Sequence, residues 1–178
     1  MKHRIIIAGL IFLFACDEPS QTPVDVEKYR KNEPTQEIYG ITYYYSDSAR
    51  LKAKLVAPHI LEKKENKEPV IHVDRGLRLE FYTSSGAKES ELTSNRAILY
   101  NQRNYAEAHE NVKVSNVNGD RLETEKLIWD KQKDKIYTDA FVKITTSKEI
   151  LKGYGMESNT AFTNYKIFKL KGSIRLKE

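Results

Sequence analysis

Apolar and polar residues alternate along much of the chain, most regularly between residues 136 and 145. One face of this stretch carries Ile136, Thr138, Ala140, Val142 and Ile144. The other face carries Tyr137, Asp139, Phe141, Lys143 and Thr145. A period of two is that of a β-strand with one buried face and one solvated face. The same period predicts a second strand of this kind at Ala106, Ala108, Glu110, Val112 and Val114.

An internal repeat of about thirty residues organises these strands. Leu92 and Leu99 recur as Leu122 and Trp129, and residues 112–114 recur as residues 142–144. A weaker third copy, thirty-two residues further on, aligns Ile136, Thr138, Ala140 and Val142 with Phe168, Leu170, Gly172 and Ile174. The repeat predicts strand units that stack in sequence, because each unit can bury its apolar face only against its neighbours.

Turn signals separate the predicted strands, and Asn118-Gly119 is a strong hairpin signal. All five prolines lie at or before Pro69, so later strands need not be interrupted. Good helix formers make a helix over residues 122–136 the competing interpretation, but the matching copy around residues 94–97 reads as strand. The pattern therefore predicts an all-β fold: a repetitive antiparallel structure of roughly a dozen strands, with exposed edge strands at both ends.

The inward positions of these strands form an apolar wall. Its members are Leu92, Ala97, Leu99, Val112, Val114, Leu122, Leu127, Trp129, Ile136, Val142, Ile144, Phe168, Leu170 and Ile174. Periodicity alone favours a closed core between two sheets. The alternative is a sandwich that splays along one long edge, so that its walls line a groove for acyl chains. Small residues at Ala97, Ala106 and Ala108 leave room for such a groove.

The first sixteen residues predict an export signal. Lys2, His3 and Arg4 precede an apolar run of eleven residues, whereas a membrane-spanning helix needs about 20. The run ends in Leu13-Phe14-Ala15-Cys16, which resembles a bacterial lipobox. The resemblance implies that residues 1–15 are removed as a signal peptide and that Cys16 is acylated. The alternatives are an uncleaved short anchor and a buried cysteine within a signal peptide.

A polar segment follows the predicted lipidation site. Residues 16–37 contain Pro19, Pro23 and Pro34 and few apolar positions, which is typical of a flexible tether. Asp17 resembles the signal that keeps some lipoproteins at the inner membrane. The folded domain is predicted to occupy residues 38–178.

The composition of the chain excludes several kinds of site and partner. The chain has 178 residues, a net charge of +5, 39% hydrophobic and 31% charged residues, which suits one well-solvated domain. Its single cysteine excludes an intramolecular disulfide and any multi-cysteine metal site. Acidic and basic residues are interspersed, as in residues 62–68, which argues against nucleic-acid binding.

No catalytic motif stands out in the sequence. The histidines at His3, His59, His72 and His109 lack the spacing of a metal pair. The chain has neither a Gly-rich phosphate loop nor a Gly-x-Ser-x-Gly nucleophile motif. We therefore predict that the protein is not an enzyme and that it uses neither a metal nor a cofactor.

Several motifs carry a resemblance to a known family. Residues 111–114 are followed by Asn118-Gly119 and by a segment that ends in Trp129-Asp130. The pattern continues as Ile136-Tyr137-Thr138-Asp139 and then as Gly153-Tyr154-Gly155-Met156. Over about residues 38–175 this resembles the LptC family, the periplasmic components of lipopolysaccharide export with an OstA/LptA-like β-jellyroll. Many relatives use a membrane-spanning helix, so an acylated Cys16 would make this chain a lipoprotein-type variant.

The resemblance implies a splayed β-jellyroll, or β-taco, that carries the lipid A acyl chains of lipopolysaccharide. The lipid would come from an LptBFG-type ABC transporter and pass to an LptA-like periplasmic bridge protein. The protein would stand in the periplasm, anchored to the inner membrane through its lipid. The implied partner edges are Ile38, Ile41, Tyr43 and Tyr45 near the transporter, and Tyr165, Ile167, Lys169 and Ile174 near the bridge.

Two other interpretations stay open. The chain could be a structural β-repeat lipoprotein that binds protein partners through its edge strands without carrying lipid. It could also be a bridge-like paralogue instead of the inner-membrane component.

Overall fold

The computed structural model describes residues 36–66 and 68–176, and these residues form eleven β-strands and one short 3-10 helix. The elements are β1 (Gln36–Asp47), β2 (Arg50–Glu65), β3 (Glu68–Val73), β4 (Leu77–Tyr82), β5 (Lys88–Ser94), β6 (Arg96–Tyr100), η1 (Asn101–Arg103), β7 (Tyr105–Asn116), β8 (Arg121–Asp130), β9 (Lys135–Thr145), β10 (Glu149–Asn159) and β11 (Tyr165–Arg175). The predicted all-β class is confirmed. The alternative helix over residues 122–136 is wrong, because β8 and the start of β9 occupy that stretch.

The predicted signal peptide, Cys16 and nearly all of the predicted tether lie outside the described residues. The first described strand begins at Gln36, two residues before the domain boundary expected at Ile38. Among the described residues, no helix has the length and apolar character needed to cross a membrane.

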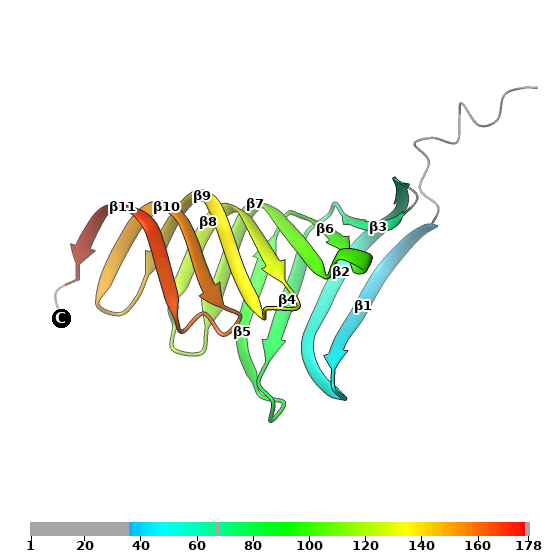
Figure 1. Ribbon diagram of the computed structural model, residues 1–178, viewed down its shortest axis with the longest axis horizontal. Helices are drawn as coiled ribbons and strands as arrows, with labels where there is room; N and C mark the ends of the chain where they lie inside the picture. Colours follow the sequence, from blue (N-terminus) through cyan, green and yellow to red (C-terminus); the bar gives the residue numbers. More distant parts are fainter. Residues whose placement is uncertain (1–35, 67, 177–178) are drawn as a thin grey trace, which may run out of the picture. The chain divides into compact units, whose positions relative to one another are not determined.

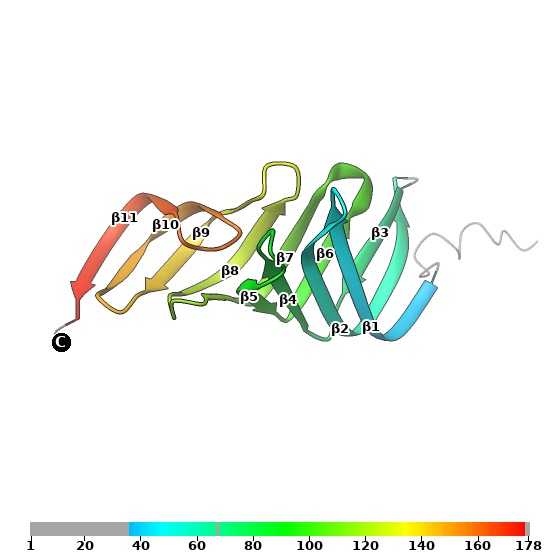
Figure 2. The same ribbon diagram turned by 90° about the horizontal axis from the view of Figure 1, so that it is seen from below.

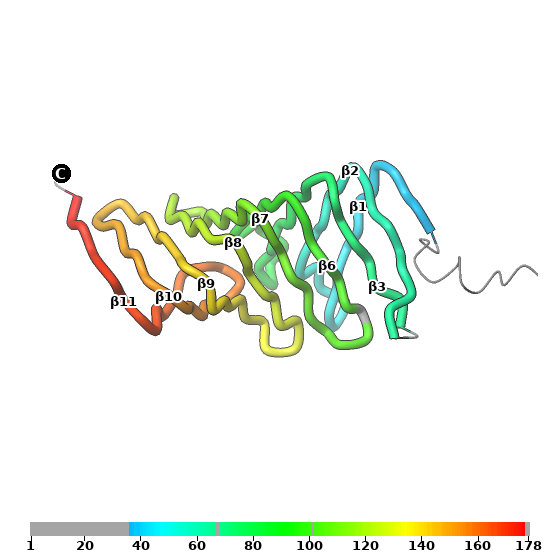
Figure 3. The backbone as a smooth tube through the Cα atoms, turned by 90° about the horizontal axis from the view of Figure 1, so that it is seen from above, coloured from blue at the N-terminus to red at the C-terminus, as the bar shows by residue number. Residues whose placement is uncertain are grey.

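The strands follow one another as a continuous antiparallel meander (Figure 1). β3 and β4 act as two halves of one strand, because β3 pairs with residues 60–65 of β2 and β4 pairs with residues 53–56. β6 and β5 pair with the two halves of β7 in the same way. From β7 onward each strand pairs with the next, and the backbone trace advances in sequence order to β11 (Figure 3). The stacking of hairpins predicted from the repeat is confirmed.

A line of irregular residues crosses this meander and bends it. The break between β3 and β4 ends at Gly76, and the break between β5 and β6 is Asn95. The Gly76 amide donates to the Asn95 carbonyl at 2.8 Å, and the Asn95 amide donates to the Glu110 carbonyl at 3.0 Å. Glu110, Asn111 and Gly155 have φ of 64°, 51° and 71°, and the pairing register shifts beside them. Bulges of this kind bend the strand and increase its twist.

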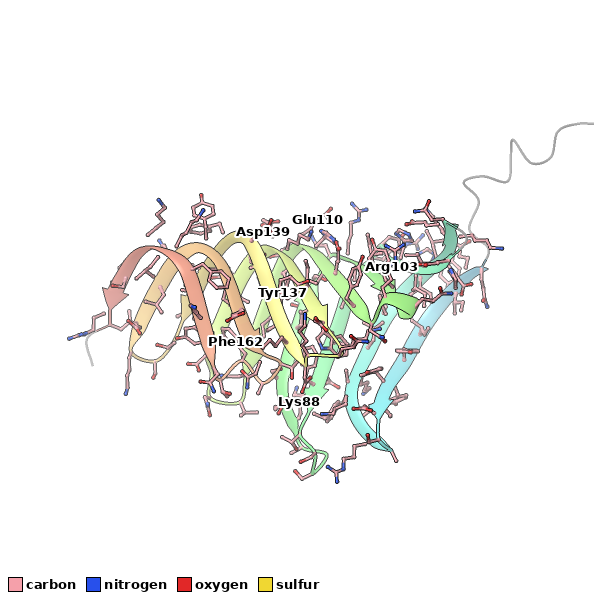
Figure 4. The ribbon with its side chains drawn as sticks, viewed as in Figure 1. Lys88, Arg103, Glu110, Tyr137, Asp139 and Phe162 are labelled. Atoms are coloured by element: carbon pink, nitrogen blue, oxygen red, sulfur yellow. The ribbon has the colours of Figure 1, made fainter. Side chains whose placement is uncertain are left out.

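The bend creates two arms that face each other. The β4–β5 arm contains β4, β5 and the adjoining halves of β2 and β7, and the β3–β6 arm contains β3, β6 and the remaining halves. Glu110 and Asp139 lie along the bent edge in Figure 4, whereas Lys88 and Phe162 lie toward the opposite edge. We call this opposite edge the mouth.

One hydrophobic cluster lies between the arms. The alternation predicted for residues 136–145 is confirmed, since Ile136, Val142 and Ile144 are fully buried whereas Tyr137 and Phe141 are exposed. A period of two therefore sends one set of side chains inward along each arm. The bend converts this single inner face into two facing walls.

The two ends of the meander are free edges within the described residues, since β1 pairs only with β2 and β11 only with β10. A buried histidine fastens the first edge. His59 on β2 places Nδ1 2.6 Å from Asp74 and Nε2 2.7 Å from Glu37 on β1. The hydrogen bonds to Asp74 and Glu37 raise the pKa of His59, because they favour the protonated ring, in which both nitrogens donate to carboxylates.

Candidate functional site: an apolar groove between the arms

A groove lies between the arms in the N-terminal half of the meander. Its cavity volume is about 40 Å³, and the groove opens partly to solvent. The lining residues are Tyr43, Tyr45, Ala53, Leu55, Leu77, Leu79, Leu92, Ala97, Leu99, Ala106, Glu107, Ala108, Leu127, Trp129 and Lys131. Both arms contribute, because Leu79 and Leu92 belong to the β4–β5 arm and Leu99 and Ala106 to the β3–β6 arm.

Alanines keep this part of the interior from closing. Ala97 of β6 pairs with Ala108 of β7, and Ala106 pairs with both Leu99 and Trp129. Cross-strand partners have their Cβ atoms about 5 Å apart on the same face. A row of methyl groups therefore leaves space that larger side chains would fill. The three alanines that were predicted to leave room, Ala97, Ala106 and Ala108, all line the groove.

An aromatic cluster forms one end of the groove. The Trp129 ring meets the rings of Tyr45 and Phe81 edge-on, with centroids 5.4 and 5.0 Å apart. Trp129 is 6% exposed, and its Nε1 has no hydrogen-bond acceptor among the described residues. The Lys131 Nζ lies 5.6 Å from the centre of the Tyr45 ring and 5.9 Å from that of Trp129. Burial lowers the pKa of the Lys131 ammonium.

Beyond this end, the loop between β10 and β11 folds back toward β5 and β7 (Figure 2). Phe162 of this loop is fully buried in the hydrophobic cluster. Its carbonyl accepts a hydrogen bond of 2.8 Å from Asn116 Nδ2 at the end of β7. The Thr160 carbonyl accepts a hydrogen bond from the Ser90 hydroxyl of β5. The Thr160 hydroxyl donates a hydrogen bond to Asp134. The loop therefore crosses the mouth, bonded to the end of the β4–β5 arm through Ser90 and Asn116 and to the β8–β9 turn through Asp134.

The structure separates the predicted wall residues into three sets. Those that line the groove are Leu92, Ala97, Leu99, Leu127 and Trp129. Those buried in the closed part of the interior are Val112, Val114, Leu122, Ile136, Val142 and Ile144. Those that are more than half exposed on β11 are Phe168, Leu170 and Ile174. The first two sets belong to the same hydrophobic cluster, and the third set lies outside it.

The exposed set departs from the predicted alternation for a structural reason. The pairing of β10 with β9 shifts at Gly155, and its pairing with β11 shifts at Gly153. Phe168 consequently lies against Gly155 and shares a shallow outer pocket with Tyr137 and Tyr154. Leu170 pairs with Gly153 on the inner face, but no described strand follows β11 to cover it.

The predicted edge residues lie on the two free edges. On β1, Ile38, Ile41 and Tyr45 are partly buried against the core, whereas Tyr43 is 37% exposed. On β11, Tyr165 and Ile167 pack against the core. Lys169 and Ile174 are exposed there. Both edges thus combine an apolar inner row with backbone groups that have no strand partner on one side.

Sequence reasoning missed several residues of the groove, together with Phe81 and Phe162 of the surrounding core. Leu77, Leu79 and Phe81 alternate with polar residues on β4, so the same period-two argument would have placed them on the inner wall. Lys131 and Phe162 lie in turns, where no periodicity indicates direction.

The described residues hold no group of three or more His, Cys, Asp or Glu side chains that could bind a metal ion. A comparison with protein-family models matches residues 4–175 to the family LptC, described as lipopolysaccharide-assembly, LptC-related. No curated protein matches the chain. The family match spans nearly the whole sequence, including the segments that form the groove.

Proposed function

The chain belongs to the LptC-related family of lipopolysaccharide-assembly proteins, and we propose that it carries lipopolysaccharide through the groove between its arms. The observation that supports this is the apolar groove itself, lined by both arms and kept open by alanines. The protein would receive the lipid from an inner-membrane ABC transporter of the LptBFG type. It would then pass the lipid to a periplasmic bridge protein built on a similar jellyroll.

The energetics suit a relay. Each CH₂ of an acyl chain gains about 0.8 kcal/mol on leaving water for an apolar site. Successive grooves that offer a similar gain let the chain move on without being trapped. Direction then has to come from ATP hydrolysis by the transporter.

The free edges support the partner assignments. β1 and β11 each have one side without a strand partner in the described residues. Such edges accept a strand from another protein by β-augmentation. We assign the β1 edge to the transporter and the β11 edge to the bridge, so that the groove joins them.

The anchoring proposal concerns Cys16. Acylation there would hold the domain at the periplasmic face of the inner membrane, because two or more acyl chains give stable attachment where one does not. The polar segment up to residue 37 would give the domain reach.

The β10–β11 loop would obstruct a lipid that moves from the groove toward the bridge protein. Phe162 occupies the interior between the groove and β11. A lipid that travels along the inside of the arms must therefore displace this side chain. Ser90 and Asn116 hold the loop by single hydrogen bonds, each worth about 1 kcal/mol net.

Depletion of the protein from its native cells tests the proposal. We expect newly made lipopolysaccharide to accumulate at the inner membrane and to fall at the cell surface. Two variants refine the test: Ala106→Phe fills the groove, and Ile98→Phe enlarges the β6 residue between Ala97 and Leu99, which does not line the groove.

Wild type and Ile98→Phe should restore export in depleted cells, whereas Ala106→Phe at equal abundance should not. Unchanged export after depletion would contradict the proposal and favour a lipoprotein that binds protein partners only through its edges.

A further inference from the structure

Two hydrogen-bond donors, Trp129 Nε1 and Lys131 Nζ, lie at the aromatic end of a mainly apolar groove. Trp129 Nε1 is buried and has no acceptor among the described residues. The Lys131 ammonium lies over the rings of Tyr45 and Trp129. A buried N–H without a partner is costly, and nearly all such groups in folded proteins are satisfied.

The carboxylates around Lys131 are engaged elsewhere. Asp130 pairs with Lys133 at 3.1 Å. Glu107 accepts from His109 at 2.9 Å and lies 3.6 Å from Lys126. Among the described residues, Lys131 itself forms no ion pair. The ammonium is therefore a partly buried positive charge without a counter-ion at the groove.

The position of Lys131 is fixed by the fold. Its backbone amide donates to the Asn104 carbonyl at 2.8 Å, which ties the turn after β8 to the turn before β7. Asn104 adopts a left-handed conformation that directs its carbonyl there. The backbone of Lys131, from which the side chain extends, is therefore held in place beside the groove.

Packing against aromatic rings explains only part of this arrangement. A cation over two rings gains from their negative faces. That interaction uses neither the three N–H donors of the ammonium nor the indole N–H. Both donors stay available to oxygen atoms, and most of the side chains that line the groove beside them are apolar.

We propose that Trp129 and Lys131 form a polar subsite for an acylated, phosphorylated lipid whose chains lie in the groove. The indole N–H donates to an acyl carbonyl oxygen, and the ammonium binds a phosphate of the headgroup. The inference rests on the proposed function and adds to it the part of the lipid that sets its position in the groove. Charge complementarity selects this occupant over an uncharged lipid.

The test compares two lipids that differ only in phosphate. The full chain, with a photoreactive amino acid at Leu99 in the groove, is placed in liposomes that contain either bis-phosphorylated lipid A or the same lipid A without phosphates. We expect wild type to capture the phosphorylated form about tenfold more efficiently, as one charge-assisted hydrogen bond implies.

The variants separate the two donors. Lys131→Met should abolish the preference for phosphate and leave capture of the dephosphorylated form unchanged. Trp129→Phe should reduce capture of both forms about equally. Lys133→Met alters an exposed lysine two residues along that pairs with Asp130, and it should behave as wild type.

A Lys131→Met protein that keeps the wild-type preference overturns the proposal, and so does equal loss of both lipids in that variant. Capture of both lipids by wild type without preference also overturns it, while leaving the proposed function intact. Capture of neither lipid by wild type contradicts the proposed function itself.

Discussion

At the scale of single residues, His59 shows how the first edge is held. It is buried on β2, between Asp74 at the bend and Glu37 on β1. Hydrogen bonds to His59 lower the pKa of Asp74, and bonds from Tyr39 and His59 lower the pKa of Glu37. The three groups therefore stabilise the fold most when the histidine is charged and both carboxyls are ionised.

This arrangement predicts a pH dependence. The raised pKa of His59 means that its contribution is complete below its unfolded pKa of about 6.5 and is lost as the pH rises through the folded value. The contributions of Asp74 and Glu37 are lost as the pH falls through their lowered values. Urea unfolding should thus show wild type losing stability from pH 6.5 upward relative to His59→Gln. The same loss in the variant would contradict this assignment.

At the same scale, Phe162 and Phe168 provide a substitution of a buried phenylalanine and its exposed control. Phe162 is fully buried, whereas Phe168 is 53% exposed. Phe162→Ala should lower the free energy of unfolding by about 3–5 kcal/mol because it leaves a cavity. Phe168→Ala should lower it by less than about 1 kcal/mol. Equal losses in chemical denaturation would show that the loop does not fill the interior.

At the scale of elements, the pairing of β10 with β11 depends on a glycine. A Cβ added at Gly153 would lie 2.6 Å from the Lys169 carbonyl oxygen and 2.6 Å from Ile167 Cγ2. The backbone oxygen cannot move without breaking the ladder. Gly172 lies in the same ladder, and a Cβ there would meet nothing within 4 Å.

Gly153→Ala should therefore loosen β11, and Gly172→Ala should not. Hydrogen exchange would show this as faster exchange of the β11 amides in Gly153→Ala, with the amides of β7 and β8 unchanged. If both variants protect β11 as wild type does, the close approach at Gly153 does not constrain the edge.

The same elements show what the sequence predicts and where it fails. Alternation in residues 92–145 placed Leu99, Trp129 and Ile144 on one inner wall, because a period of two fixes the face as long as the strand is regular. Each bulge then shifts the register by one residue and reverses the face. The shifts near Gly155 and Gly153 depend on pairing between strands. The faces of Phe168 and Ile174 could therefore not be read from alternation.

At the scale of the whole folded unit, one meander contains both a groove and a closed interior. Alanines keep the groove open beside β6 and β7, and larger side chains with Phe162 close the interior from β8 to β10. The sequence predicted the wall but not this division, because the division depends on a loop that returns from β10 to meet Ser90 and Asn116. Each end of the meander leaves one strand edge without a partner among the described residues.

Photo-crosslinking in living cells tests the central claim most directly. A photoreactive amino acid is placed at Leu99, which lines the groove, or at Ile98, the neighbouring residue on the other face of β6. Irradiation should attach lipopolysaccharide to the protein from Leu99 and not from Ile98. Attachment from neither position, or equally from both, would contradict transport through the groove.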